Sequence, residues 1–173
     1  MELKVVRYEL VGRTALGGHA ERGGYDTGTP DDIVTPGTGV DPRFEVDFAY
    51  HFGIAKPIIA AINGPAAGVG FVLACYCDLR FAADHAKLTT AHGKLNLPAE
   101  YGLSWLLPRI VGVGRALDLL LSSRIILPDE ALAWGLVNQV HTDDELMPAT
   151  LSYAERLASS VSRHSLAASK HQT

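Results

Sequence analysis

The 173-residue sequence predicts an α/β fold with a parallel sheet, and three observations support that prediction. An apolar segment at 58–62 is followed by a tight Asn63-Gly64-Pro65 turn and then by a glycine-containing helical segment. Further along the chain, short apolar segments typical of buried strands alternate with segments of helical periodicity. The length and the 47% apolar composition are those of one globular domain with a sizeable core.

The first part of the chain divides at residue 42. Residues 2–11 predict a strand, and residues 12–42 predict a poorly ordered segment, because they are rich in Gly, Pro, Thr and Asp and lack a hydrophobic period. Residues 43–173 form the expected core. Its first element is an amphipathic helix ending near Gly53, since Phe44, Phe48 and Phe52 recur every four residues.

The elements that follow are expected from local patterns and from the Gly and Pro residues that separate them. Pro108 should bend or split the helix that contains it. Extended segments are expected at 58–62, 79–82, 87–90, 125–127 and 136–140. Helices are expected at 66–76, from Tyr101 onward, at 112–122, from Pro128 to Gly135, and at 145–161.

Charge and composition exclude several classes of partner. The net charge of −4, without a Lys/Arg cluster, argues against nucleic acid. Residues 57–77 carry no charge and are long enough to span a bilayer, but Asn63-Gly64-Pro65 would break a lipid-exposed helix. A buried strand and helix explain the same segment without a membrane. The segment at 1–4 does not resemble a signal peptide, so we expect a cytoplasmic protein.

Two cysteines, Cys75 and Cys77, lie on nearly opposite sides of the expected helix. They form neither a disulfide nor a metal-binding pair, and we interpret them as small buried residues. We therefore expect no metal site.

Several separate motifs occur in an order that resembles the crotonase (enoyl-CoA hydratase/isomerase) superfamily, over about residues 43–165. They are Asn63-Gly64-Pro65-Ala66-Ala67-Gly68-Val69-Gly70, Cys77-Asp78-Leu79-Arg80-Phe81-Ala82, Pro98-Ala99-Glu100-Tyr101-Gly102, Leu107-Pro108-Arg109-Ile110-Val111-Gly112 and Gly135-Leu136-Val137-Asn138-Gln139-Val140. The resemblance implies a right-handed spiral of ββα units, incomplete at the N-terminus, with C-terminal helices. Both ends look shorter than in relatives.

The resemblance also implies a substrate and a mode of binding. Family members bind an acyl-CoA thioester, and two backbone N–H groups hold the thioester oxygen while an enolate forms. The second donor is matched by the N–H of Val69, in a motif that includes Ala66 and Gly68. The nearest candidate for the first donor loop is Leu16-Gly17-Gly18-His19, which lacks the aspartate of the family's loop; the alternative is a flexible Gly-rich loop without this role. No cofactor is implied beyond the CoA of the substrate.

Relatives assemble as trimers, so the resemblance implies a homo-oligomer. The helix from Glu145 should then expose an apolar stripe that includes Leu146, Leu151 and Leu157. Exposure of these residues would favour self-association.

The resemblance to the superfamily is weakest at the residues that would transfer protons. Hydratases use two glutamates, and the corresponding positions are Val72, which cannot transfer a proton, and His92, which can. Glu100 matches the position where isomerases of the superfamily place an acid. The structural alternatives are a loop histidine bonded to backbone and an acid at a helix start. Trp105 would either line the acyl pocket or pack in the core, and the core is the expected place.

The sequence therefore supports two functions. The first is an enoyl-CoA hydratase/isomerase-type enzyme with Glu100 and His92 as acid–base residues. The alternative is a truncated, non-catalytic member that binds acyl-CoA or a homologous subunit, which the valine at position 72 favours.

Overall fold

The computed structural model describes residues 50–172. The predicted strand at 2–11, the predicted poorly ordered segment at 12–42, and His19 lie outside the described residues. The expected helix with Phe44, Phe48 and Phe52 is described only at its end, where α2 (Tyr50–Gly53) stops at the glycine as predicted.

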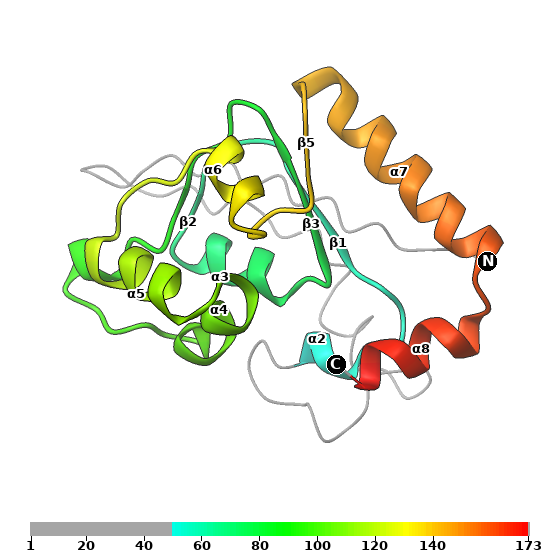
Figure 1. The fold of residues 1–173 in the computed structure, drawn as a ribbon, viewed down its shortest axis with the longest axis horizontal. Helices are drawn as coiled ribbons and strands as arrows, with labels where there is room; N and C mark the ends of the chain where they lie inside the picture. Colours follow the sequence, from blue (N-terminus) through cyan, green and yellow to red (C-terminus); the bar gives the residue numbers. More distant parts are fainter. Residues whose placement is uncertain (1–49, 173) are drawn as a thin grey trace, which may run out of the picture.

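Strands and helices alternate along the described chain, which confirms the predicted α/β class (Figure 1). After α2 the elements are β1 (Ile59–Ile62), β2 (Ala66–Ala67), α3 (Val69–Tyr76), β3 (Leu79–Ala83), β4 (Leu88–Thr89), the 3₁₀ helix η3 (His92–Leu95), α4 (Leu103–Val111), α5 (Val113–Ser122), α6 (Pro128–Ala133), β5 (Gln139–His141), α7 (Asp143–Ser160) and α8 (Arg163–Gln172).

The strands form two parallel sheets. The larger has the order β1-β3-β5, with Ile59 beside Leu79 and Phe81 beside Gln139. The smaller consists of β2 and β4, with Ala66 beside Leu88. Parallel pairing was the expectation from the sequence, because helical segments separate the strands.

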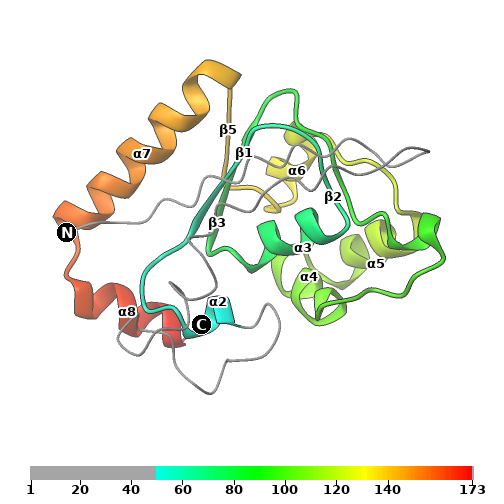
Figure 2. The same cartoon turned by 180° about the vertical axis from the view of Figure 1, so that it is seen from behind.

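The larger sheet is covered on both faces, and the alternation of side chains along β1 explains how. Ile58, Ala60 and Ile62 pack into a core cluster that includes residues of α3, α4 and α5. Ile59 and Ala61 point the other way, into a second cluster with residues of α7. Figures 1 and 2 show α7 on one side of these strands and α3 on the other.

The expected start of the helix after the turn was wrong by three residues. Ala66 and Ala67 form β2, and α3 begins only at Val69. The reason is tertiary: the N–H of Ala66 donates to the carbonyl of Lys87 across 2.9 Å, so this backbone is used in a strand ladder before the helix begins.

Three further expectations about elements need correction. Of the two outcomes expected for Pro108, the split is wrong, because α4 runs through the proline to Val111 and ends at Gly112, whose φ of 83° is incompatible with a helix. The bend stays a prediction. The last strand is Gln139–His141, later than predicted, because Leu136 and Val137 are buried in the turn after α6. Helix α8 was not predicted at all.

The apolar stripe expected on the surface of α7 is in large part buried. Leu146 is fully buried and Leu157 packs against the same cluster, on the face of the sheet formed by Ile59 and Phe81. Only Leu151 is substantially exposed. The expectation failed because this stripe covers the sheet of its own chain, so it gives no support for self-association.

The polar and ionisable side chains in and beside this core are either kept uncharged or given specific partners. Cys75 and Cys77 are buried, and burial raises the pKa of the Cys75 thiol to about 12, so it stays protonated. The Arg80 guanidinium donates to the carbonyl oxygens of Leu136 and Cys77. Asp78 accepts from the Ile58 N–H and from Lys170 of α8. No helix within residues 50–172 has the length and apolar character needed to cross a membrane.

Candidate active site

The first turn of α3 presents backbone N–H groups that the helix itself does not use. The first intrahelical bond runs from the Val72 N–H to the Gly68 carbonyl at 3.0 Å, so the N–H groups of Val69, Gly70 and Phe71 have no acceptor within the helix. Among the described residues, no side chain caps this end. The Gly68 N–H is already donated to Thr89, which makes Val69 the first available donor.

Gly68 lets the chain turn from β2 into α3. Its φ of 55° and ψ of −122° lie outside the regions that residues with a side chain prefer. A Cβ at this position would meet no described atom within 4 Å. The glycine is therefore required by backbone conformation and not by close contact with another described residue. Val69 itself is 36% exposed.

The smaller sheet brings a second candidate residue to this point. Because β2 and β4 run parallel, with Ala67 beside Thr89, the two strands end at the same edge. Beyond that edge β2 continues into the N-terminus of α3, and β4 continues into η3, which begins with His92. The structure thus brings together the segments that carry Ala66, Gly68, Val69 and His92.

His92 is buried, with 3% of its surface exposed. Its Nδ1 is buried and has no hydrogen-bond partner among residues 50–172. A buried polar atom without a partner is uncommon and costs free energy. At Nδ1 this departs from the structural alternative of a loop histidine bonded to backbone.

Glu100 comes from a different loop. Residues 101 and 102 both have positive φ, and the hydroxyl of Tyr76 on α3 donates to the Tyr101 carbonyl across 2.7 Å. Glu100 is half-buried. It precedes α4 by three residues, so it lies outside the first helical turn. No described contact joins it to His92.

Two other positions were considered from the sequence. Val72 is fully buried in the core, as suits an apolar residue at that position of α3. Trp105 was expected in the core, and this was wrong, because 53% of it is exposed. The Arg109 guanidinium lies 3.7 Å from the centre of its ring, and a cation stacked on the indole compensates for incomplete burial.

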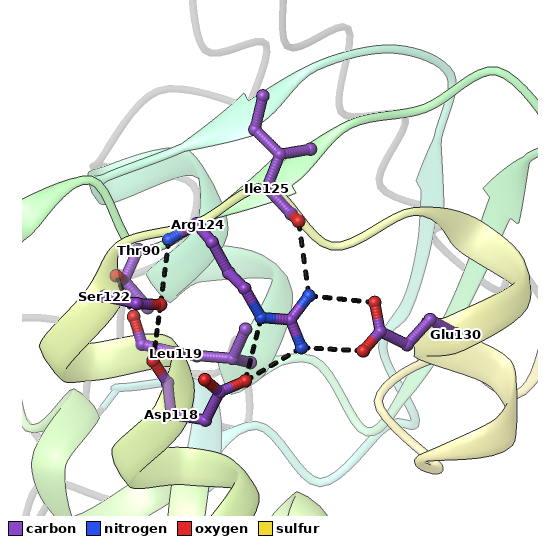
Figure 3. Close-up of polar contacts among 7 residues, drawn as sticks. All are labelled: Thr90, Asp118, Leu119, Ser122, Arg124, Ile125 and Glu130. Carbon is purple, nitrogen blue, oxygen red and sulfur yellow. Dashed lines mark hydrogen bonds and ion pairs between the residues drawn. The ribbon is translucent and has the colours of Figure 1, made fainter.

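Helices α5 and α6 are joined by an ionic bridge that the sequence analysis did not identify. Arg124 donates to Glu130 at 2.9 and 2.6 Å and to Asp118 at 2.8 Å, so its guanidinium lies between two carboxylates (Figure 3). These hydrogen bonds lower the pKa of Glu130. The bridge fixes the segment between the helices, which includes Ser123.

The described part of the chain contains no group of three His, Cys, Asp or Glu side chains placed to hold a metal ion. The available chemical groups are backbone donors at the start of α3, one buried imidazole and one half-buried carboxylate. Such donors suit an oxygen that gains negative charge, and the two side chains can transfer protons.

The parallel strands, the glycine-containing turn and the donor-bearing helix start define a crotonase-like α/β protein. The family model described as enoyl-CoA hydratase/isomerase matches residues 40–173, and the chain belongs to that family.

Curated relatives and solved structures agree with this assignment. The chain is 34% identical over 130 residues to 4-chlorobenzoyl coenzyme A dehalogenase-1 of Arthrobacter sp, covering 71% of this chain and 47% of that protein. It is 43% identical over 104 residues to crotonyl-CoA hydratase of Syntrophomonas wolfei, covering 60% and 40%. The crystal structure of an enoyl-CoA hydratase from Bacillus anthracis matches with a TM-score of 0.69 and 35% identity, over 71% of this chain and 47% of that one.

The chain therefore spans less than half the length of these relatives. Their names share a CoA thioester but describe different reactions, a dehalogenation and a hydration. Family membership alone does not select the reaction.

Proposed function

We propose that this protein acts on an acyl-CoA thioester by stabilising an enolate, with the thioester oxygen held by the backbone N–H of Val69. The observation that carries the proposal is the common end of β2 and β4. It sets uncapped N–H groups of α3 beside the turn that carries His92. A site of this kind supplies fixed dipoles where negative charge develops.

Ala66 and Gly68 support the donor. Ala66 anchors β2 to β4, and Gly68 provides the backbone conformation that starts α3 at Val69. The segment that ends at His19 is proposed as the source of the first donor, by the family resemblance. No cofactor is proposed beyond the CoA of the substrate.

The proton steps are assigned to His92 and Glu100. The buried Nδ1 of His92 has no partner in the described part of the chain, and Glu100 is half-buried in the loop that precedes α4. Val72 supplies no proton-transferring group at the position where hydratases use a glutamate. Because water addition needs groups at both carbons, we propose that isomerisation of the double bond exceeds hydration.

A second function is favoured by one observation, the buried valine at position 72. A protein without the usual acid at that position would bind an acyl-CoA, or a homologous subunit, without turning over the thioester. Oligomerisation, trimer-based as in relatives, belongs with either function as a proposal.

Product analysis separates these functions. The protein is incubated with 2-enoyl, 3-enoyl and dienoyl thioesters, and each product is followed. We expect double-bond migration to be faster than formation of the hydroxyacyl product. Hydration as the dominant reaction, unaffected by changes at Glu100 and His92, would refute the assignment. Binding of every thioester without turnover would favour the non-catalytic alternative.

A further inference from the structure

The turn that carries His92 has an unusual backbone. Ala91, immediately before η3, has φ 61°, and Asn96, immediately after it, has φ 56°. Left-handed conformations are disfavoured for residues with a side chain, and for alanine the side chain offers no compensating hydrogen bond. The surroundings of η3 must therefore hold this conformation.

Ser123 supplies much of that support. It lies at the end of α5, is 1% exposed, and has φ 46° itself. Its Oγ accepts a hydrogen bond from the Gly93 N–H at 2.8 Å and lies 3.4 Å from the hydroxyl of Thr90. The Thr90 hydroxyl in turn donates to the Leu119 carbonyl of α5 (Figure 3).

The same serine reaches the other side of His92 through Thr89. The Thr89 hydroxyl donates to the Ser123 carbonyl at 3.1 Å and accepts from the Ala91 N–H at 3.1 Å. The backbone N–H groups immediately before and after His92 are thus both bound to groups that Ser123 supplies or orients. This explains how an alanine is held at a positive φ.

The approach of the two segments is close. A Cβ added to Gly93 would lie 2.9 Å from the Ser123 Oγ and 3.4 Å from the Leu121 carbonyl. Only glycine fits there without displacing the serine hydroxyl. Since the His92 Nδ1 has no partner among the described residues, the position of the ring depends on its backbone and on packing.

We infer that Ser123 is a positioning residue for His92: through Gly93 and Thr89 it fixes the backbone turn from which the imidazole projects. Ser123 is not a catalytic residue, because its hydroxyl is bound within the fold. The importance of this positioning for catalysis rests on the proposed proton-transfer role of His92, but the geometric effect on the imidazole does not.

The test uses nuclear magnetic resonance of the imidazole groups in the whole chain. Spectra are recorded from about pH 5 to 8, where histidine titrates, and the His92 signals are assigned by their loss in His92→Gln. The main variant is Ser123→Gly, which removes the hydroxyl while allowing the left-handed backbone. Thr89→Val removes the second link independently, and Ser122→Ala removes a neighbouring hydroxyl that does not contact η3.

We expect the His92 signals to shift or broaden in Ser123→Gly and in Thr89→Val, and to remain unchanged in Ser122→Ala. For a thioester that the wild type converts, kcat should fall about 10- to 100-fold in Ser123→Gly with little change in KM, because a misplaced group loses proximity. His92 signals identical to wild type in both folded variants would overturn the inference. Full turnover by His92→Gln would instead refute the proton-transfer role and leave the spectroscopic result to decide the positioning.

Discussion

The backbone N–H of Gly68 donates to the carbonyl of Thr89 across 3.3 Å, and this hydrogen bond links the residue that follows β2 to the last residue of β4. Because the Gly68 N–H is used in this bond, the next N–H along the chain, that of Val69, is the first one available to a ligand. The same bond sets the start of α3 beside the segment that leads from β4 to His92. One backbone contact therefore relates the two parts of the proposed site.

Gly68→Ala should destabilise the protein by roughly 1–3 kcal/mol, because alanine is strained at φ 55° and ψ −122°. Steric contact is not the cause, since the added Cβ would meet no described atom within 4 Å. Chemical denaturation measures the change. Gly64→Ala is the matched control, because its Cβ also has open space and its φ is not left-handed, so its stability should stay near that of wild type. Equal stability of the two variants would contradict this account of Gly68.

Glu100→Gln should lower turnover by about 10²–10⁴, the usual contribution of general acid–base catalysis, if Glu100 takes the proton step. Binding of the acyl-CoA should stay nearly constant, because the amide preserves the shape of the side chain. Steady-state kinetics and binding titration measure the two effects. Glu155→Gln changes an exposed acid on α7 and serves as the control. A parallel loss of binding and turnover would argue for a structural role of Glu100.

The ionic bridge between α5 and α6 should make stability depend on pH. Hydrogen bonds from Arg124 lower the pKa of Glu130 from its usual 4.5, so the folded state binds this proton less readily than the unfolded state does. The stabilisation is therefore fully present above about pH 4.5 and is lost as the pH falls through the lower folded value.

Thermal unfolding of wild type and Glu130→Gln between neutral and acidic pH tests this dependence. The difference in Tm between them should be present at pH ~7 and should shrink as the pH falls toward ~3. Asp129→Asn, at the neighbouring acid, should not reproduce this pattern, because Arg124 pairs with Asp118 and Glu130. A Tm difference that grows on acidification would contradict the assigned sign.

The fold was predictable where burial decides the structure. The strand at 58–62 was recognised because a sheet covered on both faces requires an apolar residue at every position, and β1 meets that requirement. The start of α3 was missed because Ala66 and Ala67 suit a helix locally, and only their pairing with β4 makes them a strand. Helix α8 has no buried residue, so no apolar stripe signalled it.

The candidate site was predictable only in part. The motif around Val69 and the positions of His92 and Glu100 were found from the family resemblance. The positive φ of Ala91 and Ser123 was not predicted. Neither residue type favours that conformation, and tertiary hydrogen bonds impose it. Ser123 lies thirty residues from Gly93 in the sequence, and no local pattern predicts a hydrogen bond between residues so far apart.

The most direct test of the central claim, that an enolate is stabilised by the Val69 N–H, is exchange of the α-protons of a bound acyl-CoA with solvent deuterium. Val69→Pro removes this N–H, and proline is well tolerated at the first position of a helix. Val69→Ala keeps the N–H and serves as the control. The account predicts exchange by wild type and Val69→Ala, slowed about 10²–10³-fold in Val69→Pro. Exchange at the same rate in a folded Val69→Pro as in Val69→Ala would contradict it.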